Sequence, residues 1–249
     1  MLKIDRHAYI LEEIKKNHLV RVTRLARVLN VTEMTVRRDL KELEDFGQVV
    51  RVHGGAKQKP KTFYQEDNYN KKININIDEK REIAKKAASI IKDNETIFIG
   101  AGSTTSYLHE FIEGKTLNII TNSIIVFNQF KDTANCDLIF VGGRYREKTK
   151  GFIGYFTQEV LSKISVNKAF IGVNGIDLEA LTISDEEEGR CNATILDNST
   201  EKYVLADHTK FAAHAFYSFY EVKELTGVIT DSKLDEAIKE QYKKTLKVV

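Results

Sequence analysis

The chain has 249 residues and a formal net charge of +2, with 42% hydrophobic and 30% charged residues, which is typical of a globular protein and not of a disordered one. No apolar run approaches the ~20 residues that span a bilayer and the charged N-terminus has no signal-peptide core, so we expect a cytoplasmic protein without a membrane segment. Cys136 and Cys191 are isolated and the six histidines are scattered, so we predict no metal site and no cofactor.

Charge is distributed unevenly along the chain. Residues 1–60 hold 13 Lys and Arg against 8 Asp and Glu, a net charge of +5, whereas residues 61–249 hold 25 against 28, a net charge of −3. A small basic segment followed by a larger, slightly acidic one indicates a polyanionic partner for the first segment only.

The first segment, residues 1–56, has the pattern of a small helical domain. In its third expected helix, Val36, Leu40 and Leu43 recur at one-face spacing, Thr32 is a suitable N-cap, and Gly47 is a suitable stop. The expected elements are helices over 2–16, Val22–Leu29 and Glu33–Phe46, and a hairpin over Gln48–Gly55.

This domain is predicted to be a winged helix-turn-helix that reads double-stranded DNA. Ala26 allows two helices to cross closely, and Asn30 tolerates the positive φ that the turn requires. The third helix then presents its polar face to a major groove, and the hairpin acts as the wing. The alternative is that this face is only the charged outer side of an amphipathic helix. The predicted DNA-contacting residues are Thr23, Thr32, Met34, Thr35, Arg37, Arg38, Lys41, Arg51 and His53.

Residues 57–77 break this pattern and are interpreted as an interdomain linker. They contain Pro60 and a run rich in Asn and Lys, with extended structure predicted at Ile73, Ile75 and Ile77.

Residues 78–249 alternate between helix and strand, which predicts a mainly parallel sheet covered on both faces. Such sheets bind ligands at the carboxyl ends of their strands. The expected elements are a helix over 78–92, a helix from about Thr104, a last helix over Leu234–Lys244, and strands over Thr96–Ile99, Leu117–Thr121, Asp137–Val141, Lys168–Val173, Lys202–Ala206 and Gly227–Thr230.

The loop over Gly100–Thr105 is the first candidate ligand site, because its glycines and hydroxyls follow a strand and precede a helix. The loop matches neither the Walker motif, since it lacks Gly-Lys-Ser/Thr, nor the dinucleotide-binding motif G-x-G-x-x-G, so a nucleotide is not indicated. Lys210 or Arg144 would neutralise a phosphate, while Asp177 and Asp207 would accept sugar hydroxyls. The alternative is that each is an ordinary turn or cap residue. The predicted effector-binding residues are Gly100, Gly102, Ser103, Thr104, Thr105, Thr121, Asn122, Arg144, Asp177, Asp207 and Lys210.

The run VTRLARVLNVTEMTVRRDLKELEDFGQVVRVHGGA resembles the N-terminal signature of the DeoR family of bacterial regulators. IITNS, FVGGRYR, AFIGVNGID and YVLADHTKF are similar to the sensor motifs of that family. The resemblance implies a sensor related in fold to ribose-5-phosphate isomerase, DNA binding by Thr35, Arg37 and Arg38, a homo-oligomer (dimer or tetramer), and phosphate at the 102–105 loop and Lys210.

Two stretches depart from that family pattern. Gly100 stands where the family often has Asp, and residues 178–189 are unusually acidic. Gly100 and the EKY…DHTK stretch also resemble repressors of lactose/tagatose-6-phosphate catabolism.

These patterns predict a non-enzymatic transcriptional regulator, a repressor of a carbohydrate-utilisation operon whose DNA affinity is controlled by a phosphorylated sugar. A rival hypothesis is a sugar-phosphate isomerase using Asp177 or Asp207 with Lys210. An isomerase gains nothing from a winged helix, which disfavours that hypothesis. A third is a winged helix used only for protein contacts.

Overall fold

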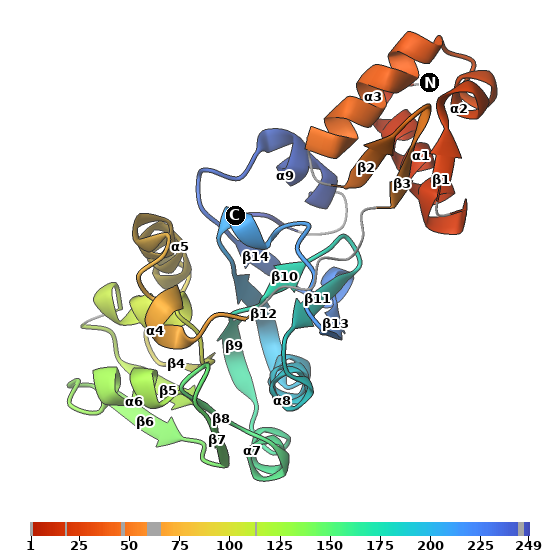
Figure 1. Cartoon of the computed structure of the whole chain (residues 1–249). Coiled ribbons are helices and arrows are strands. Elements are labelled where there is room, and N and C mark those ends of the chain that lie inside the picture. Colours follow the sequence, from red (N-terminus) through yellow and green to blue (C-terminus); the bar gives the residue numbers. More distant parts are fainter. Residues whose placement is uncertain (1, 18, 46–47, 59–65, 113, 244–246) are drawn as a thin grey trace. The chain divides into compact units, whose positions relative to one another are not determined.

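The computed structural model describes residues 2–17, 19–45, 48–58, 66–112, 114–243 and 247–249 (Figure 1). The chain divides into two compact units, Met1–Thr62 and Phe63–Val249. Among the described residues, none of the helices has both the length and the apolar character needed to cross a membrane.

In its described residues, the first unit contains three helices and a three-stranded antiparallel sheet of order β1-β3-β2. One apolar cluster joins them, and residues such as Ile10, Val36 and Leu43 are fully buried in it. Strand β1 was not expected, and the hairpin runs further than predicted; Phe46, Gly47 and Pro60 lie outside the described residues. The elements are α1 (Lys3–Asn17), β1 (Leu19–Arg21), α2 (Val22–Leu29), α3 (Glu33–Asp45), β2 (Val49–Val52) and β3 (Gly55–Gln58).

The turn between α2 and α3 has the geometry that its residues predict. Asn30 has φ 52° and ψ 49°, in the left-handed region, and its backbone N–H bonds to carbonyls at the end of α2. Thr32 caps α3, since its Oγ1 accepts a hydrogen bond from the backbone N–H of Thr35 at 3.2 Å. The predicted N-cap and the predicted positive φ are both confirmed.

The second unit is built on a six-stranded parallel sheet of order β14-β12-β9-β4-β5-β6. Alternate strand residues enter two separate cores: Ile97 and Ile99 pack with α5, whereas Phe98 and Ala169 lie in the cluster that includes α8. Both faces of the sheet are therefore covered, as predicted. The strands are β4 (Glu95–Ile99), β5 (Leu117–Thr121), β6 (Cys136–Phe140), β9 (Val166–Ile171), β12 (Ser199–Leu205) and β14 (Gly227–Ile229). The α-helices are α4 (Tyr69–Lys72), α5 (Ile77–Ser89), α6 (Ile124–Phe130), α7 (Tyr155–Leu161), α8 (Glu186–Asp197) and α9 (Glu236–Tyr242).

Several elements of this unit were not expected from the sequence. Helix α8 begins in the acidic stretch: Asp185 caps it by accepting from the backbone N–H of Glu188, and acidic residues in a first turn complement the helix dipole. The other additions are α7, the hairpin of β7 (Arg144–Arg146) and β8 (Gly151–Ile153), the antiparallel sheet of β10 (Gly175–Ile176), β11 (Ala180–Ile183) and β13 (Tyr217–Glu221), and the 3₁₀ helices η2 (His208–Lys210) and η3 (Val222–Glu224).

Two local predictions were wrong. The helix expected from about Thr104 is a six-residue 3₁₀ helix, η1 (Thr105–Glu110), so no full α-helical dipole points at the preceding loop. The extended structure expected at Ile73, Ile75 and Ile77 is absent: Ile73 ends α4 and Ile77 begins α5. Residues 66–77, predicted as linker, pack on the second unit, where the Tyr69 hydroxyl bonds to that of Ser106 at 2.9 Å.

Candidate functional site

Helix α3 separates an apolar face from a basic one. Val36, Leu40 and Leu43 are at most 1% exposed, whereas Arg37, Arg38 and Lys41 are all exposed. Met34 is 74% exposed on the same helix, and Thr35 is partly exposed. The predicted DNA-contacting face is therefore accessible, and its cations are available for phosphates and base edges.

The remaining predicted DNA contacts lie on α2, at the turn and on the wing, where Thr23, Thr32, Arg51 and His53 are exposed. Two arginines of the surface have weak intramolecular partners. Arg37 lies 3.3 Å from Glu33 and Arg51 lies 3.9 Å from Glu44. Exposed pairs of this kind contribute little, so DNA phosphates can replace these carboxylates.

A buried ion pair that sequence reasoning missed holds α3 against α1. Asp39 is 0% exposed and Arg6 is 8% exposed. The Arg6 guanidinium donates to both carboxylate oxygens of Asp39, at 2.8 Å and 3.0 Å. Breaking such a pair leaves a buried charge unpaired, so this contact fixes how α3 packs and which side of it faces solvent. The sequence did contain a signal for this pair, because Asp39 immediately precedes Leu40 of the apolar face of α3.

The second unit contains a cavity of about 210 Å³ at the carboxyl ends of β4, β9 and β12. One water needs roughly 10–15 Å³ by the same measure, so a small organic molecule fits. Strands β5 and β6 follow β4 on one side, and β9, β12 and β14 follow on the other. The order of strands therefore reverses between β4 and β9, where open α/β sheets bind their ligands.

Five of the predicted effector residues line this cavity. The loop after β4 contributes three of them, and the loop after β12 contributes a carboxylate and an ammonium. They are Gly102, Ser103, Thr104, Asp207 and Lys210.

Four other predicted residues, Gly100, Thr105, Thr121 and Asn122, lie behind the cavity and support its loop. The Thr105 hydroxyl donates to the carbonyls of Gly100 and Gly102, at 2.7 Å and 3.0 Å. The Thr121 hydroxyl donates to the Ile99 carbonyl at 2.6 Å. The Asn122 side chain accepts from the N–H of Ala101 at 3.2 Å and donates to the carbonyl of Phe152 at 2.8 Å. These residues shape the loop instead of lining the cavity.

Arg144 and Asp177 also lie outside the cavity lining. Arg144 follows β6, on the far side of β4 from the reversal point, and forms an ion pair with Glu187. Asp177 forms a turn, since one of its oxygens accepts from the backbone N–H groups of Glu179 and Ala180 at 2.7 Å and 2.6 Å. Asp177 is therefore not positioned as the base of an isomerase.

Lys80 is a wall residue of the cavity that sequence reasoning missed. It is 3% exposed, and its ammonium donates to the carbonyls of Ile75, at 2.5 Å, and Lys72. Burial lowers the pKa of Lys80 to about 8, while the Asp207 carboxylate opposes this shift. The signal was its position on the same face of α5 as Ile83, Ala84 and Ala87.

Lys210 adds a second cation, and Asp207 lies beside both. Burial lowers the pKa of Lys210, and Asp207 again opposes the shift. Asp207 is 3% exposed, and its Oδ1 caps η2 by accepting from the backbone N–H of Thr209 at 3.0 Å. The carboxylates of Asp67 and Glu188 also line the cavity, and Asp67 likewise opposes the shift at Lys210. The two partly desolvated ammoniums are the groups of this lining that can bind an anionic ligand.

A second buried charge cluster adjoins the cavity. Arg146 forms ion pairs with Glu66, at 2.5 Å, with Asp185, at 3.3 Å, and with Glu188, at 3.4 Å. Glu188 lines the cavity and is 5% exposed, and burial raises its pKa to about 7. The cluster ties residue 66, which follows the unit boundary, to a wall of the cavity.

A winged helix-turn-helix joined to an α/β unit with a polar, charge-lined cavity defines a ligand-responsive, DNA-binding regulator. Residues 6–62 match the model of the DeoR-like helix-turn-helix domain, and residues 75–232 match that of the DeoR C-terminal sensor domain. The chain belongs to the DeoR family, as its motifs predicted, and is a regulator and not an enzyme.

Relatives along the full length agree with this assignment. The chain is 38% identical over 251 residues to the lactose phosphotransferase system repressor of Staphylococcus aureus (strain NCTC 8325 / PS 47), covering 100% of both chains. It is 37% identical over 247 residues to the protein of that name from Streptococcus mutans, covering 98% of each.

Solved structures give weaker matches. Ribose 5-phosphate isomerase A from Methanocaldococcus jannaschii matches with a TM-score of 0.38 and 23% identity, over 55% of this chain and 55% of that one. The eIF2B beta subunit from Chaetomium thermophilum matches with a TM-score of 0.46 and 11% identity, over 69% of this chain and 54% of that one. Similarity at this level adds nothing to the fold already described.

Proposed function

We propose that this chain is a cytoplasmic repressor of a carbohydrate-utilisation operon, and that a phosphorylated sugar in the cavity of the second unit controls its affinity for operator DNA. The observation that carries the proposal is the buried Lys80 ammonium in the wall of a cavity at the reversal point of the sheet. A buried ammonium of this kind, with Lys210 near the same carboxylate, can donate charge-assisted hydrogen bonds to an anionic ligand.

The remaining walls suit the rest of such a molecule. Ser103 and Thr104 provide hydroxyls beside the cations, and Asn174 and Thr209 provide polar groups on the opposite loops. A phosphate at the lysines would place a sugar's hydroxyl groups against these side chains. The names of the full-length relatives, repressors of a lactose phosphotransferase system, support a carbohydrate as the effector.

The DNA half of the proposal assigns phosphate and base contacts to the exposed face of α3 and to the wing. A monomer reads only one short half-site, so we propose that the chain acts as a homo-oligomer, a dimer or tetramer, on half-sites about one helical turn apart. We propose that the effector acts through linkage. A sugar phosphate that binds one arrangement of the oligomer more tightly shifts the population toward that arrangement, and the affinity for the operator changes accordingly.

The test is an electrophoretic mobility shift with the DNA upstream of the chain's own gene, titrated with hexose 6-phosphates and pentose 5-phosphates at fixed salt. We expect a specific complex whose affinity changes at least tenfold with one of these compounds and not with the unphosphorylated sugar. Binding that no sugar phosphate alters would reject the effector, and the absence of a specific complex at low salt would reject the regulator. Sedimentation of the free protein measures the oligomeric state.

A further inference from the structure

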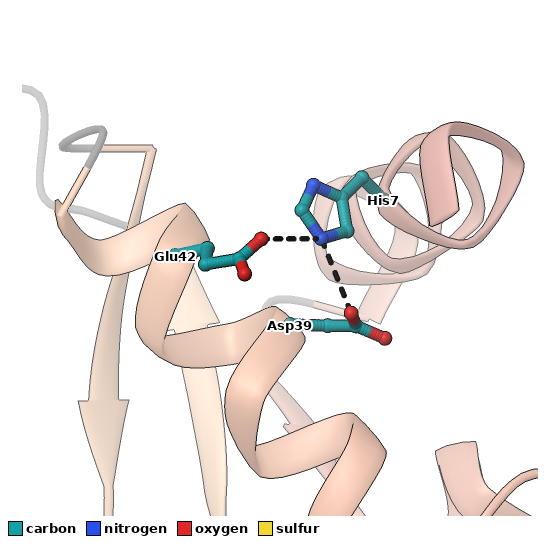
Figure 2. Close-up of side chains that lie close together, drawn as sticks. All are labelled: His7, Asp39 and Glu42. Carbon is teal, nitrogen blue, oxygen red and sulfur yellow. Dashed lines mark ion pairs between the residues drawn. The ribbon is translucent and has the colours of Figure 1, made fainter. Parts of the chain in front are cut away.

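A cluster of three potential metal ligands lies in the first unit, where α1 faces α3. His7 projects from α1 toward Asp39 and Glu42 on α3 (Figure 2). The His7 Nε2 atom lies 3.4 Å from Asp39 Oδ1 and 3.6 Å from Glu42 Oε2, and the three ligand atoms lie within 4.8 Å of one another. His7 is 8% exposed and Asp39 is 0% exposed.

Two of the three facing atoms of this cluster are not satisfied by hydrogen bonds among the described residues. The buried His7 Nε2 and Glu42 Oε2 atoms each lack a hydrogen-bond partner among the described residues, although both take part in ion pairs. A nine-tenths-buried imidazole nitrogen aimed between two carboxylates costs free energy unless something fills the gap.

The spacing matches a tetrahedral ion. Zinc bonds of about 2.0–2.2 Å place tetrahedral ligand atoms about 3.3–3.6 Å from one another. The two distances from His7 Nε2, 3.4 Å and 3.6 Å, fall at or next to this range. Glu42 has a side chain that is 27% exposed, so it has the freedom to rotate and close the remaining distance to Asp39.

We propose that His7, Asp39 and Glu42 form a binding site for a divalent transition-metal ion of the zinc class, with water as the fourth ligand. An imidazole with two carboxylates suits zinc and its neighbours, whereas calcium and magnesium prefer oxygen alone. Arg6 orients Asp39 by donating to both of its carboxylate oxygens, as the hydrogen-bonded partners of ligating carboxylates do in metalloproteins. The Lys3 ammonium lies 2.5 Å from Glu42 Oε2, and its side chain is 53% exposed. Without an ion it neutralises this carboxylate, and it would move into solvent when the ion binds.

The site would join α1 to the recognition helix. An ion bound by one residue of α1 and two of α3 adds its binding free energy to the folded state and stiffens the packing that presents Arg37 and Arg38. The sequence prediction of no metal site considered only spacing along the chain, which does not show that α1 and α3 meet.

The test is zinc titration of the full-length, chelator-treated protein by calorimetry, together with thermal unfolding at saturating zinc. We expect the wild type to bind one more equivalent of zinc than His7→Gln, and Glu42→Gln to bind it at least tenfold more weakly. His53→Gln is the matched control, since His53 is an exposed histidine of the same unit, and it should bind as the wild type does. Equal stoichiometry and affinity in the wild type, His7→Gln and Glu42→Gln would overturn the proposal. If His7→Gln does not fold, Glu42→Gln alone decides, because Glu42 is partly exposed.

Discussion

Replacing Lys80 by Met is the sharpest test of the ligand cavity, because it removes one buried charge and preserves most of the side-chain volume. Lys80 is 3% exposed, and burial holds the pKa of its ammonium at about 8, below the 10.5 of an exposed lysine. If an anionic ligand binds beside it, binding requires the protonated form. The affinity of the wild type should then fall as pH rises through 8.

The size of this effect follows from that pKa. A group with a pKa of about 8 is about 90% protonated at pH 7 and about 10% protonated at pH 9. The affinity for a sugar phosphate should therefore fall roughly tenfold between these values, since a sugar phosphate is already a dianion above its second pKa of about 6. An ordinary lysine would remain almost fully charged over this range. The Lys80→Met variant should bind more weakly at pH 7 by about 1.5–3 kcal/mol, the contribution of a charge-assisted hydrogen bond.

Calorimetric titration of the effector identified by mobility shift, at pH 7, 8 and 9, measures both effects. Lys80→Arg is the matched control, because its guanidinium stays charged and should flatten the pH profile. Any slope that remains in Lys80→Met reports Lys210, whose pKa burial also lowers. A wild-type affinity that is constant from pH 7 to 9 would refute this account of the site. So would a fall in affinity over this pH range that is as large in Lys80→Met as in the wild type.

Four further substitutions test the rest of the molecule. Arg37→Ala and Arg38→Ala should each weaken operator binding by about 1–3 kcal/mol in mobility shifts at fixed salt, and an unchanged affinity would show that α3 does not contact DNA. Asp39→Asn removes the buried carboxylate that accepts both hydrogen bonds of the Arg6 guanidinium, so urea unfolding should show a loss of about 3–5 kcal/mol, and a loss below about 1 kcal/mol would contradict the role given to the pair. Asn122→Ala should weaken effector binding by about 1–2 kcal/mol without lining the cavity, because the Gly102–Thr104 loop loses its anchor. Asn118→Ala, at an exposed position of the preceding strand β5, should leave the affinity measured by calorimetry unchanged.

The local elements of the first unit followed from the sequence because each depends on neighbouring residues. The bounds of α2 and the cap of α3 are set by spacing and by the short-range bonds of Asn30 and Thr32. Strand β1 was missed because its three residues gain their structure from β3, more than thirty residues away, through pairs such as Val20 with Ala56. A strand this short has no periodicity of its own.

The candidate site was predictable in outline because carboxyl ends of parallel strands meet at one edge. The sequence did not show where along that edge the cavity lies, because the order of strands is a long-range property. Because β4 is central in the sheet, Arg144, which follows the edge strand β6, lies away from the cavity, whereas residues that follow β9 and β12 line it. Lys80 was missed for the same reason, since its helix reaches the cavity only through packing.

Buried charges fix the orientation of the DNA-reading surface more sharply than the apolar core does. Arg38 and Asp39 are consecutive, so they point about 100° apart around α3. An apolar stripe tolerates a small rotation of the helix, because methyl groups repack at modest cost. The two hydrogen bonds from Arg6 to Asp39 do not tolerate such a rotation, because it would separate a buried carboxylate from a buried guanidinium. The ion pair therefore selects which of the two consecutive charged side chains is buried, and so directs Arg38 toward solvent, on the face that we propose contacts DNA.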